Sequence, residues 1–331
     1  MTGNTASPAG SRRSRHILAT PTDTTPREVA ILADTRWRSS YRDDAGHLVL
    51  SKYSHVDGPA ADRADSAQSV SFPPNLTQVF VATTLRERGD PPFPGSPDPT
   101  GVGRAFPYGM PIREEARVVD WLVAAARRLG GAVHLDNSGV VLVPRADAAV
   151  DLTVYSNLWL VPGAALSLVK MIDPTFRPAM EFQRWAGPGG GPLAAASQGA
   201  AIDLPSELRA DLHRRADAYD ARALSQEPVV DRYALRADLG PAGTVWLEVE
   251  GVEVPEALRR LPWTESGVVS YGLHWDPADP ANLLAEFPSP AQRAERVAAA
   301  ALLARLALAI HSATGLEILD ADAFPVDAAD L

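Results

Sequence analysis

The apolar and polar positions along the chain repeat one order of elements twice. In each copy an alternating segment predicts a strand, an amphipathic segment predicts a long helix, and a glycine leads into a short hairpin. The first copy comprises the strand 78–85, the helix 112–129, the glycines 130–131 and the hairpin 132–143; the second comprises the strand 268–275, the helix 290–313, Gly315 and the hairpin 316–326. At one constant offset, three residues of the first copy match three of the second: Gly131, Leu135 and Asp136 align with Gly315, Leu319 and Asp320.

A duplicated unit predicts an α+β protein of two related halves, each a mainly antiparallel sheet backed by a long helix, with a cleft or partner surface between them. The segment 1–27 is rich in Ser, Thr, Pro, Gly and Arg and lacks periodicity, which predicts a disordered tail. We divide the remainder into a first half at 28–195 and a second half at 196–331, with the glycine- and proline-rich segment 187–192 near the boundary. Because few identities support the match, a chance similarity of composition is the alternative.

Local signals predict further elements. Residues 28–37 and 46–53 are expected to be strands of the first sheet, and 55–71 a polar loop. Two strands at 232–238 and 244–252 are expected to form a hairpin. The last helix is apolar on nearly all sides, which predicts burial between a sheet and another element.

Composition excludes several classes of function. The 331 residues include no cysteine, which excludes disulfides, thiolate nucleophiles, iron–sulfur clusters and cysteine-bound zinc. The net charge of −10 makes nucleic acid an unlikely partner, because a phosphate backbone is itself negative. Residues 1–25 lack the apolar core of a signal peptide, and the most apolar stretch, 297–310, is too short to cross a membrane. We therefore expect a cytoplasmic protein without a membrane partner.

Catalytic and cofactor motifs are missing from the sequence. There is no Gly-x-Ser-x-Gly elbow, no phosphate-binding loop and no dinucleotide fingerprint, and the seven histidines lack metal-binding spacing. We assign no metal and no cofactor, and a site assembled in three dimensions is the alternative. His274, in Tyr271-Gly272-Leu273-His274-Trp275 at the end of a predicted strand, is the candidate catalytic residue, against a purely structural histidine.

The segment 86–111 is the candidate binding region. It holds seven prolines and five glycines, which argues against both helix and central strand. Phe93, Phe106 and Tyr108 are unusual in a solvated linker, so we predict a loop that contacts a partner through these three residues. The alternatives are a loop that covers its own core and a mobile insertion.

The absence of catalytic motifs favours a non-catalytic intracellular protein that works in binding or assembly, with a protein partner or a second copy of itself. The alternative is an enzyme whose site is assembled from isolated residues. In that case His274 and nearby carboxylates would be the acid–base groups, and 86–111 would be a lid.

Overall fold

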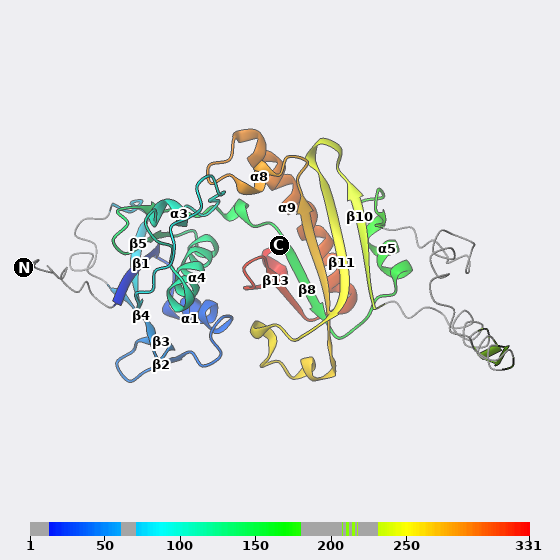
Figure 1. The fold of residues 1–331 in the computed structure, drawn as a ribbon, viewed down its shortest axis with the longest axis horizontal. Coiled ribbons are helices and arrows are strands. Elements are labelled where there is room, and N and C mark those ends of the chain that lie inside the picture. The colour runs from blue at the N-terminus through cyan, green and yellow to red at the C-terminus, as the bar shows by residue number, and fades with distance from the viewer. Residues whose placement is uncertain are drawn as a thin grey trace, which may run out of the picture.

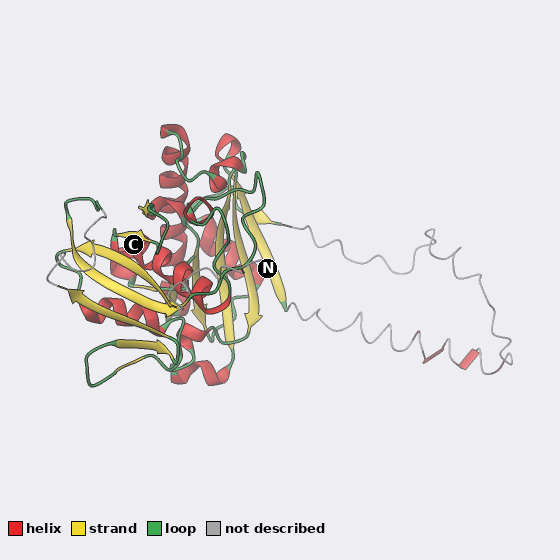
Figure 2. Cartoon of the chain, turned by 60° about the vertical axis from the view of Figure 1, so that its left-hand side comes forward, coloured by secondary structure: helices red, strands yellow, loops and turns green. Residues whose placement is uncertain are grey.

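The computed structural model describes residues 13–60, 71–179 and 231–331, together with residues 207, 210, 211, 214, 215 and 217. These residues form two antiparallel sheets of seven strands each, with six α-helices. A long helix packs against one face of each sheet (Figures 1 and 2). The predicted α+β class, with two halves that each combine a sheet and a long helix, is confirmed.

The elements of the two halves follow one another along the chain without mixing. The first half contains β1 (Arg13–Pro21), α1 (Pro26–Asp34), β2 (Tyr41–Arg42), β3 (Leu48–Ser51), β4 (Ser54–Ala60), β5 (Leu76–Leu85), α3 (Val102–Ala105), α4 (Arg113–Leu129), β6 (Ala132–His134) and β7 (Val141–Leu142). The second half contains β8 (Leu152–Ser156), α5 (Pro162–Lys170), β9 (Arg177–Pro178), β10 (Arg232–Asp238), β11 (Thr244–Val252), β12 (Val268–Asp276), α8 (Ala281–Leu284), α9 (Pro290–Thr314), β13 (Glu317–Asp320) and β14 (Pro325–Val326). Short 3₁₀ turns occupy Ala146–Ala148, Gly240–Ala242, Glu256–Leu258, Pro262–Ser266 and Ala328–Asp330.

Both sheets have the same topology. The strand order is β2-β3-β4-β5-β1-β6-β7 in the first half and β9-β10-β11-β12-β8-β13-β14 in the second. The register agrees as well: Leu18 of β1 pairs with Phe80 and Val133, and Val154 of β8 pairs with their counterparts, Tyr271 and Ile318. All six side chains are buried in the core of their own half. Among the described strands, the order and the register therefore agree with the duplication inferred from the sequence.

The sequence alignment of the two copies is wrong by one residue. The residues that end the long helices are Gly130, with φ of 62°, and Gly315, with φ of 66°, so Gly130 and not Gly131 is the counterpart of Gly315. The structural equivalence places Val133 on Ile318, both facing the core. Because Gly130 and Gly131 are adjacent, either could be aligned with Gly315 from the sequence alone.

The predicted limits of the halves also need correction. Residues 13–21 were assigned to a disordered tail, but they form β1, which lies between β5 and β6 and is buried along most of its length. Its apolar core, Ile17-Leu18-Ala19, is short, and the arginine-rich flank obscured it. Strands β8 and β9 were assigned to the first half but belong to the second sheet. The predicted boundary at 187–196 lies outside the described residues.

Two elements differ in type from the prediction. Residues 28–37 were expected to be a strand, but 26–34 form α1, because Thr25 and Glu28 make a reciprocal capping box and Val29, Leu32 and Ala33 share a buried face. Part of the expected loop 55–71 is strand β4. The hairpin β10–β11 is confirmed residue for residue.

Helix α9 buries one side and exposes the other. Its core side includes Leu303, Leu306 and Ile310, whereas the side chain of Val297 is 60 % exposed. The expectation that this helix is buried all round was therefore wrong. By length and composition alone α9 could cross a membrane, with a mean hydropathy of 1.6, but core helices of soluble proteins pass the same test. Here α9 packs on β8, β12 and β13.

The two halves are joined by the hairpin β13–β14. Phe324, at its turn, belongs to the second half but is fully buried in the core of the first. Around it, Arg127 of α4 forms an ion pair with Asp322, and Arg36 donates a hydrogen bond to the Asp322 carbonyl at 3.2 Å. The guanidinium of Arg128 donates to the carbonyl of Pro325 at 3.3 Å. The contact therefore combines one buried aromatic side chain, that of Phe324, with an ion pair and two hydrogen bonds made by three arginines.

We expect Leu303→Ala and Leu306→Ala to lower the free energy of unfolding by about 2–5 kcal/mol each, from lost transfer energy and the cavity left behind. Val297→Ala, on the exposed side of the same helix, is the control and should change it by less than about 0.5 kcal/mol. Urea denaturation followed by circular dichroism measures all three. Equal midpoints for the three variants would contradict the described orientation of α9.

Candidate functional site

The segment 86–111 is an ordered crossover between β5 and α4. Its two ends run antiparallel to each other, with a β-bridge between Arg88 and Pro111. Backbone hydrogen bonds join Gly89 N–H to the Met110 carbonyl and Met110 N–H to the Asp90 carbonyl, both at 2.9 Å. The base of the loop is therefore closed in the manner of a hairpin, and its tip projects from a fixed stem.

A buried carboxylate anchors this stem to the core. Glu115, in the first turn of α4, is fully buried and accepts hydrogen bonds from the Glu87 N–H at 2.7 Å and from the Arg88 guanidinium at 2.8 Å. Nε2 of His16, on β1, lies 3.3 Å from the same carboxylate. The anchor thus ties the loop to a helix and to a central strand at once.

Electrostatics keep this carboxylate ionised. Burial alone would raise the pKa of Glu115, but its contacts with His16 and Ser14, the N–H of Glu87 and the charge of Arg88 outweigh burial and hold the pKa below its usual value. Its place in the first turn of α4 adds the favourable field of the helix N-terminus. Breaking such a buried pair by removing one partner is costly, because it leaves an uncompensated charge.

Phe106 is part of the core and not of the surface. Its side chain is only 7 % exposed and belongs to the apolar cluster of the first half. The guanidinium carbon of Arg88 lies 3.9 Å from the centre of the Phe106 ring, a cation–π contact that shields the buried ion pair. The prediction that Phe106 contacts a partner was therefore wrong, because the loop folds this ring back under itself.

The two other aromatic residues of the loop are exposed. The side chain of Phe93 is 80 % exposed and that of Tyr108 is 95 % exposed. Both stand on a loop whose stem is fixed by hydrogen bonds and a buried ion pair. The structure thus divides the three predicted binding residues into one core residue and two accessible rings.

The corresponding crossover of the second half, between β12 and α9, lies against this loop. Arg104 of α3 forms two hydrogen bonds with the carboxylate of Glu286, at 2.5 and 3.4 Å. The buried Arg296 of α9 contacts the second crossover: its Nε donates a hydrogen bond to the side chain of Asn282 in α8 at 2.8 Å. It carries Leu283, Leu284 and Phe287 in exposed positions.

We name the exposed apolar residues of the two touching loops the crossover surface. Its members are Phe93, Tyr108, Leu283, Leu284 and Phe287. Sequence reasoning missed the contribution of the second crossover and the anchor Glu115. The available signals were an acidic pair, Glu114-Glu115, at the start of an amphipathic helix, and three large apolar residues, Leu283, Leu284 and Phe287, in the segment before Ser289.

His274 lies apart from this surface, on the face of the second sheet opposite α9. Asp151 fixes it: one carboxylate oxygen lies 3.1 Å from Nδ1 of His274, and the other accepts the N–H of Trp275 at 3.1 Å. The hydrogen bond from Asp151 raises the pKa of His274 against the opposing effect of burial, and the charge of Glu248 adds to the rise.

The ring of His274 covers Gly272. A Cβ at position 272 would lie 2.7 Å from Nε2, so any side chain there would displace the imidazole. A shallow pocket of about 240 Å³ opens beside it, lined among others by Tyr155, Glu248 and Ser270. The lining residues come from the second half, and the crossover 86–111 contributes none, so the expected lid does not cover His274.

No protein-family model, curated protein or solved structure matches the chain.

Replacing the three aromatic residues one at a time tests their different environments. We expect Phe106→Ser to lower the free energy of unfolding by about 3–5 kcal/mol or more, because it removes a packed ring and buries a hydroxyl. Phe93→Ser and Tyr108→Ser should each stay within about 0.5 kcal/mol of the parent. Urea denaturation of the purified variants gives the three values. Similar losses at all three positions would show that the exposed rings pack against the protein.

The pKa of His274 should depend on Asp151. In Asp151→Asn the hydrogen bond to a charged carboxylate is lost, so the pKa of His274 should fall toward the ordinary value of about 6.5. Glu248→Gln should lower it less, because Glu248 acts only through space. The titration of the His274 ring protons by NMR measures both shifts. An unchanged titration in Asp151→Asn would contradict the described pair.

Proposed function

We propose that this protein is a non-catalytic binding or assembly protein whose crossover surface takes a protein partner. The observation that carries the proposal is the pair of exposed rings, Phe93 and Tyr108, on a loop whose stem is fixed by the buried Glu115. An exposed aromatic ring on a mobile loop loses conformational freedom when it binds. On a fixed stem, most of that entropy has already been lost during folding.

The chemistry of the surface suits a protein partner. Aromatic side chains are the commonest energetic anchors in protein interfaces, because each brings a large contact area with few rotatable bonds. Leu283, Leu284 and Phe287 extend the apolar area onto the second half. In this proposal the exposed apolar residues of the two loops act together, and apolar patches larger than a few hundred Å² are unusual on a protein that works alone.

A partner seated on the crossover surface would contact both halves. The Arg104–Glu286 ion pair joins the two loops, so the position of one loop constrains the other. Binding would therefore depend on the relative placement of the halves as well as on the side chains that touch the partner.

A second candidate function rests on the Asp151–His274 pair. A carboxylate on Nδ1 fixes the tautomer and orientation of an imidazole and leaves Nε2 free for proton transfer, which is the arrangement of a general acid–base. In this alternative His274 would be the catalytic residue and Glu248 a neighbouring carboxylate. His274→Gln would then abolish a turnover without lowering the melting temperature.

Site-specific photo-crosslinking tests the principal proposal. A photoreactive phenylalanine at position 108 or 287 of the full chain should give the same adduct from both positions in host cells. One at position 171, where the exposed Met171 lies outside the crossover surface, is the control and should not. Sedimentation of the purified chain then tells whether the adduct contains a second copy.

The adduct formed from position 287 should be lost in the double variant Phe93→Ser/Tyr108→Ser, while the melting temperature is unchanged. If the adduct persists in the double variant, or if position 171 gives the same product, the crossover surface does not take the partner.

A further inference from the structure

A pocket of about 260 Å³ lies between the two halves and shares no residue with the crossover surface. The first half contributes residues of α1 and of the turn after it. The second half contributes the yellow segment that follows β11, which Figure 1 shows beside α1. The charged lining residues are Asp34, Arg38, Glu256, Arg259 and Arg260. Junctions between structural units are a common position for small-ligand sites.

Buried neighbours hold both walls of this pocket in place. Arg38 follows Trp37, whose side chain is 2 % exposed and packs in the core of the first half. Arg259 and Arg260 follow Leu258, which is 1 % exposed and makes backbone hydrogen bonds of 3.0 and 2.9 Å within its turn. The backbone positions of the three arginines are therefore set by folding, and only their side chains need to move when a ligand binds.

One hydrogen bond crosses directly between the walls. Nη2 of Arg260 donates to the backbone carbonyl of Arg38 at 2.6 Å, and Nη1 lies 3.7 Å from Oδ2 of Asp34. The other oxygen of Asp34 accepts the hydroxyl of Ser40. Arg260 thus holds the two halves together at this point, and it leaves Arg38 and Arg259 to face the pocket from opposite walls.

Glu256 lies between Arg38 and Arg259 but satisfies neither. Its two oxygens lie 3.5 Å from Nε of Arg38 and 3.3 Å from Nε of Arg259, whereas charge-assisted hydrogen bonds are about 2.7–2.9 Å long. Oε1 of Glu256 is shielded from solvent and has no hydrogen-bond partner among the described residues. The Arg259 side chain donates instead to the carbonyl of Val254, at 3.3 Å.

Ion pairs elsewhere in the protein are shorter. Arg88 donates to Glu115 at 2.8 Å, and Arg145 donates to both carboxylate oxygens of Asp147, at 2.8 and 2.7 Å. Arginines of this chain that pair with a carboxylate can therefore reach hydrogen-bonding distance. The longer contacts of Glu256 leave guanidinium N–H groups in the pocket for a stronger acceptor.

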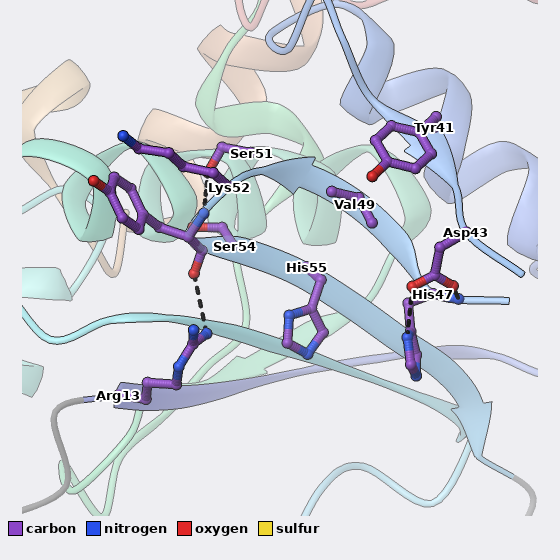
Figure 3. A pocket seen from close by; sticks show the side chains of 10 residues that line it. Arg13, Tyr41, Asp43, His47, Val49, Ser51, Lys52, Ser54 and His55 are labelled. Atoms are coloured by element: carbon purple, nitrogen blue, oxygen red, sulfur yellow. Dashed lines mark hydrogen bonds and ion pairs between the residues drawn. The ribbon is translucent and has the colours of Figure 1, made fainter. Parts of the chain in front are cut away.

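A second pocket, of about 380 Å³ on the outer face of β3 and β4, uses its cations differently (Figure 3). There the carboxylate of Asp43 lies 3.0 Å from Nδ1 of His47. Arg13 donates to the Tyr53 carbonyl at 3.3 Å, and Nζ of Lys52 lies 4.6 Å from the centre of the Tyr53 ring. All of its lining residues belong to the first half, so a ligand there would not connect the two halves.

The pocket between the halves carries a surplus of positive charge on an acidic protein. Three arginines and two carboxylates line it, whereas the whole chain has a net charge of −10. A guanidinium presents its N–H groups in a planar fork that matches the oxygens of phosphate and carboxylate groups. Ile31 and Pro325 add apolar area to the lining. The arginines can thus hold a charged group while the apolar side chains contact a carbon skeleton.

We propose that this pocket binds a small organic anion with two negative charges, held by Arg38 of the first half and Arg259 of the second. A phosphate monoester and a dicarboxylate share this chemistry. The anion would replace the long contacts that Glu256 makes with both arginines. Because Pro325 lines the pocket, the ligand would connect the halves beside the hairpin that already joins them.

Calorimetric titration of the purified full-length chain at constant ionic strength tests the proposal, with glycerol 3-phosphate and succinate as the two probes. The parent should bind one equivalent of at least one of them with a Kd below about 1 mM. Tighter binding of glycerol 3-phosphate would assign the ligand to the phosphate monoesters, and tighter binding of succinate would assign it to the dicarboxylates.

Substitutions test whether both walls contribute. Arg38→Gln and Arg259→Gln should each weaken binding by more than about tenfold, because each removes a charge-assisted contact. Arg259→Lys should weaken it less than Arg259→Gln, because the charge remains while the planar fork is lost. Glu256→Gln should bind at least as tightly as the parent, since it removes a competing carboxylate. Arg232→Gln, which removes an exposed arginine of β10 outside the pocket, is the control and should bind as the parent does.

Circular dichroism and melting temperature establish that each variant is folded. Absence of saturable binding of both probes to the parent would overturn the proposal, as would equal affinity in the parent, Arg38→Gln and Arg259→Gln. Weaker binding in Glu256→Gln would overturn it too, because the carboxylate would then support the ligand and not compete with it. An equal loss in Arg232→Gln would show that binding follows net charge alone. None of these results depends on whether the crossover surface takes a partner.

Discussion

The insertion of Phe324 into the core of the first half is the contact on which the arrangement of the molecule depends. Each half has its own sheet, helix and core, and the other contacts described between the halves are polar ones made by arginine side chains. With Phe324 buried and Arg127 paired to Asp322, the hairpin β13–β14 has one position against α4. That position brings Arg104 within reach of Glu286.

Comparison of the two halves separates what the fold requires from what was added to it. His16 of the first half occupies the position of Leu152 in the second, where an apolar side chain fills the same place in the core. A buried histidine beside a buried glutamate is therefore not needed to make this sheet. It coincides with the longer crossover of the first half, whose stem it helps to hold.

The sequence predicted the architecture better than the site. Periodicity located both long helices and the hairpin β10–β11, because these elements carry their own local signals. It failed for β1, where an arginine-rich flank hides a short apolar run whose burial comes from neighbours more than 50 residues away in sequence. For the same reason it could place Phe93 and Phe106 in one loop but could not tell that one is exposed and the other is core. Glu286 and Phe287 were missed because their role depends on the contact between the second crossover and the segment 86–111, which joins residues about 180 positions apart in the sequence.

The joint between the halves is not symmetric, although the halves are. The second half donates a hairpin and the first half receives it, so no two-fold axis exchanges the two sides of the contact. Separation would therefore affect them differently. The first half would be left with a cavity where an aromatic ring had packed, while the second would keep its own core and expose a phenylalanine to water. The second half thus completes the core of the first half, whereas the core of the second half contains no residue of the first. The first half is therefore the one whose packing depends on the contact.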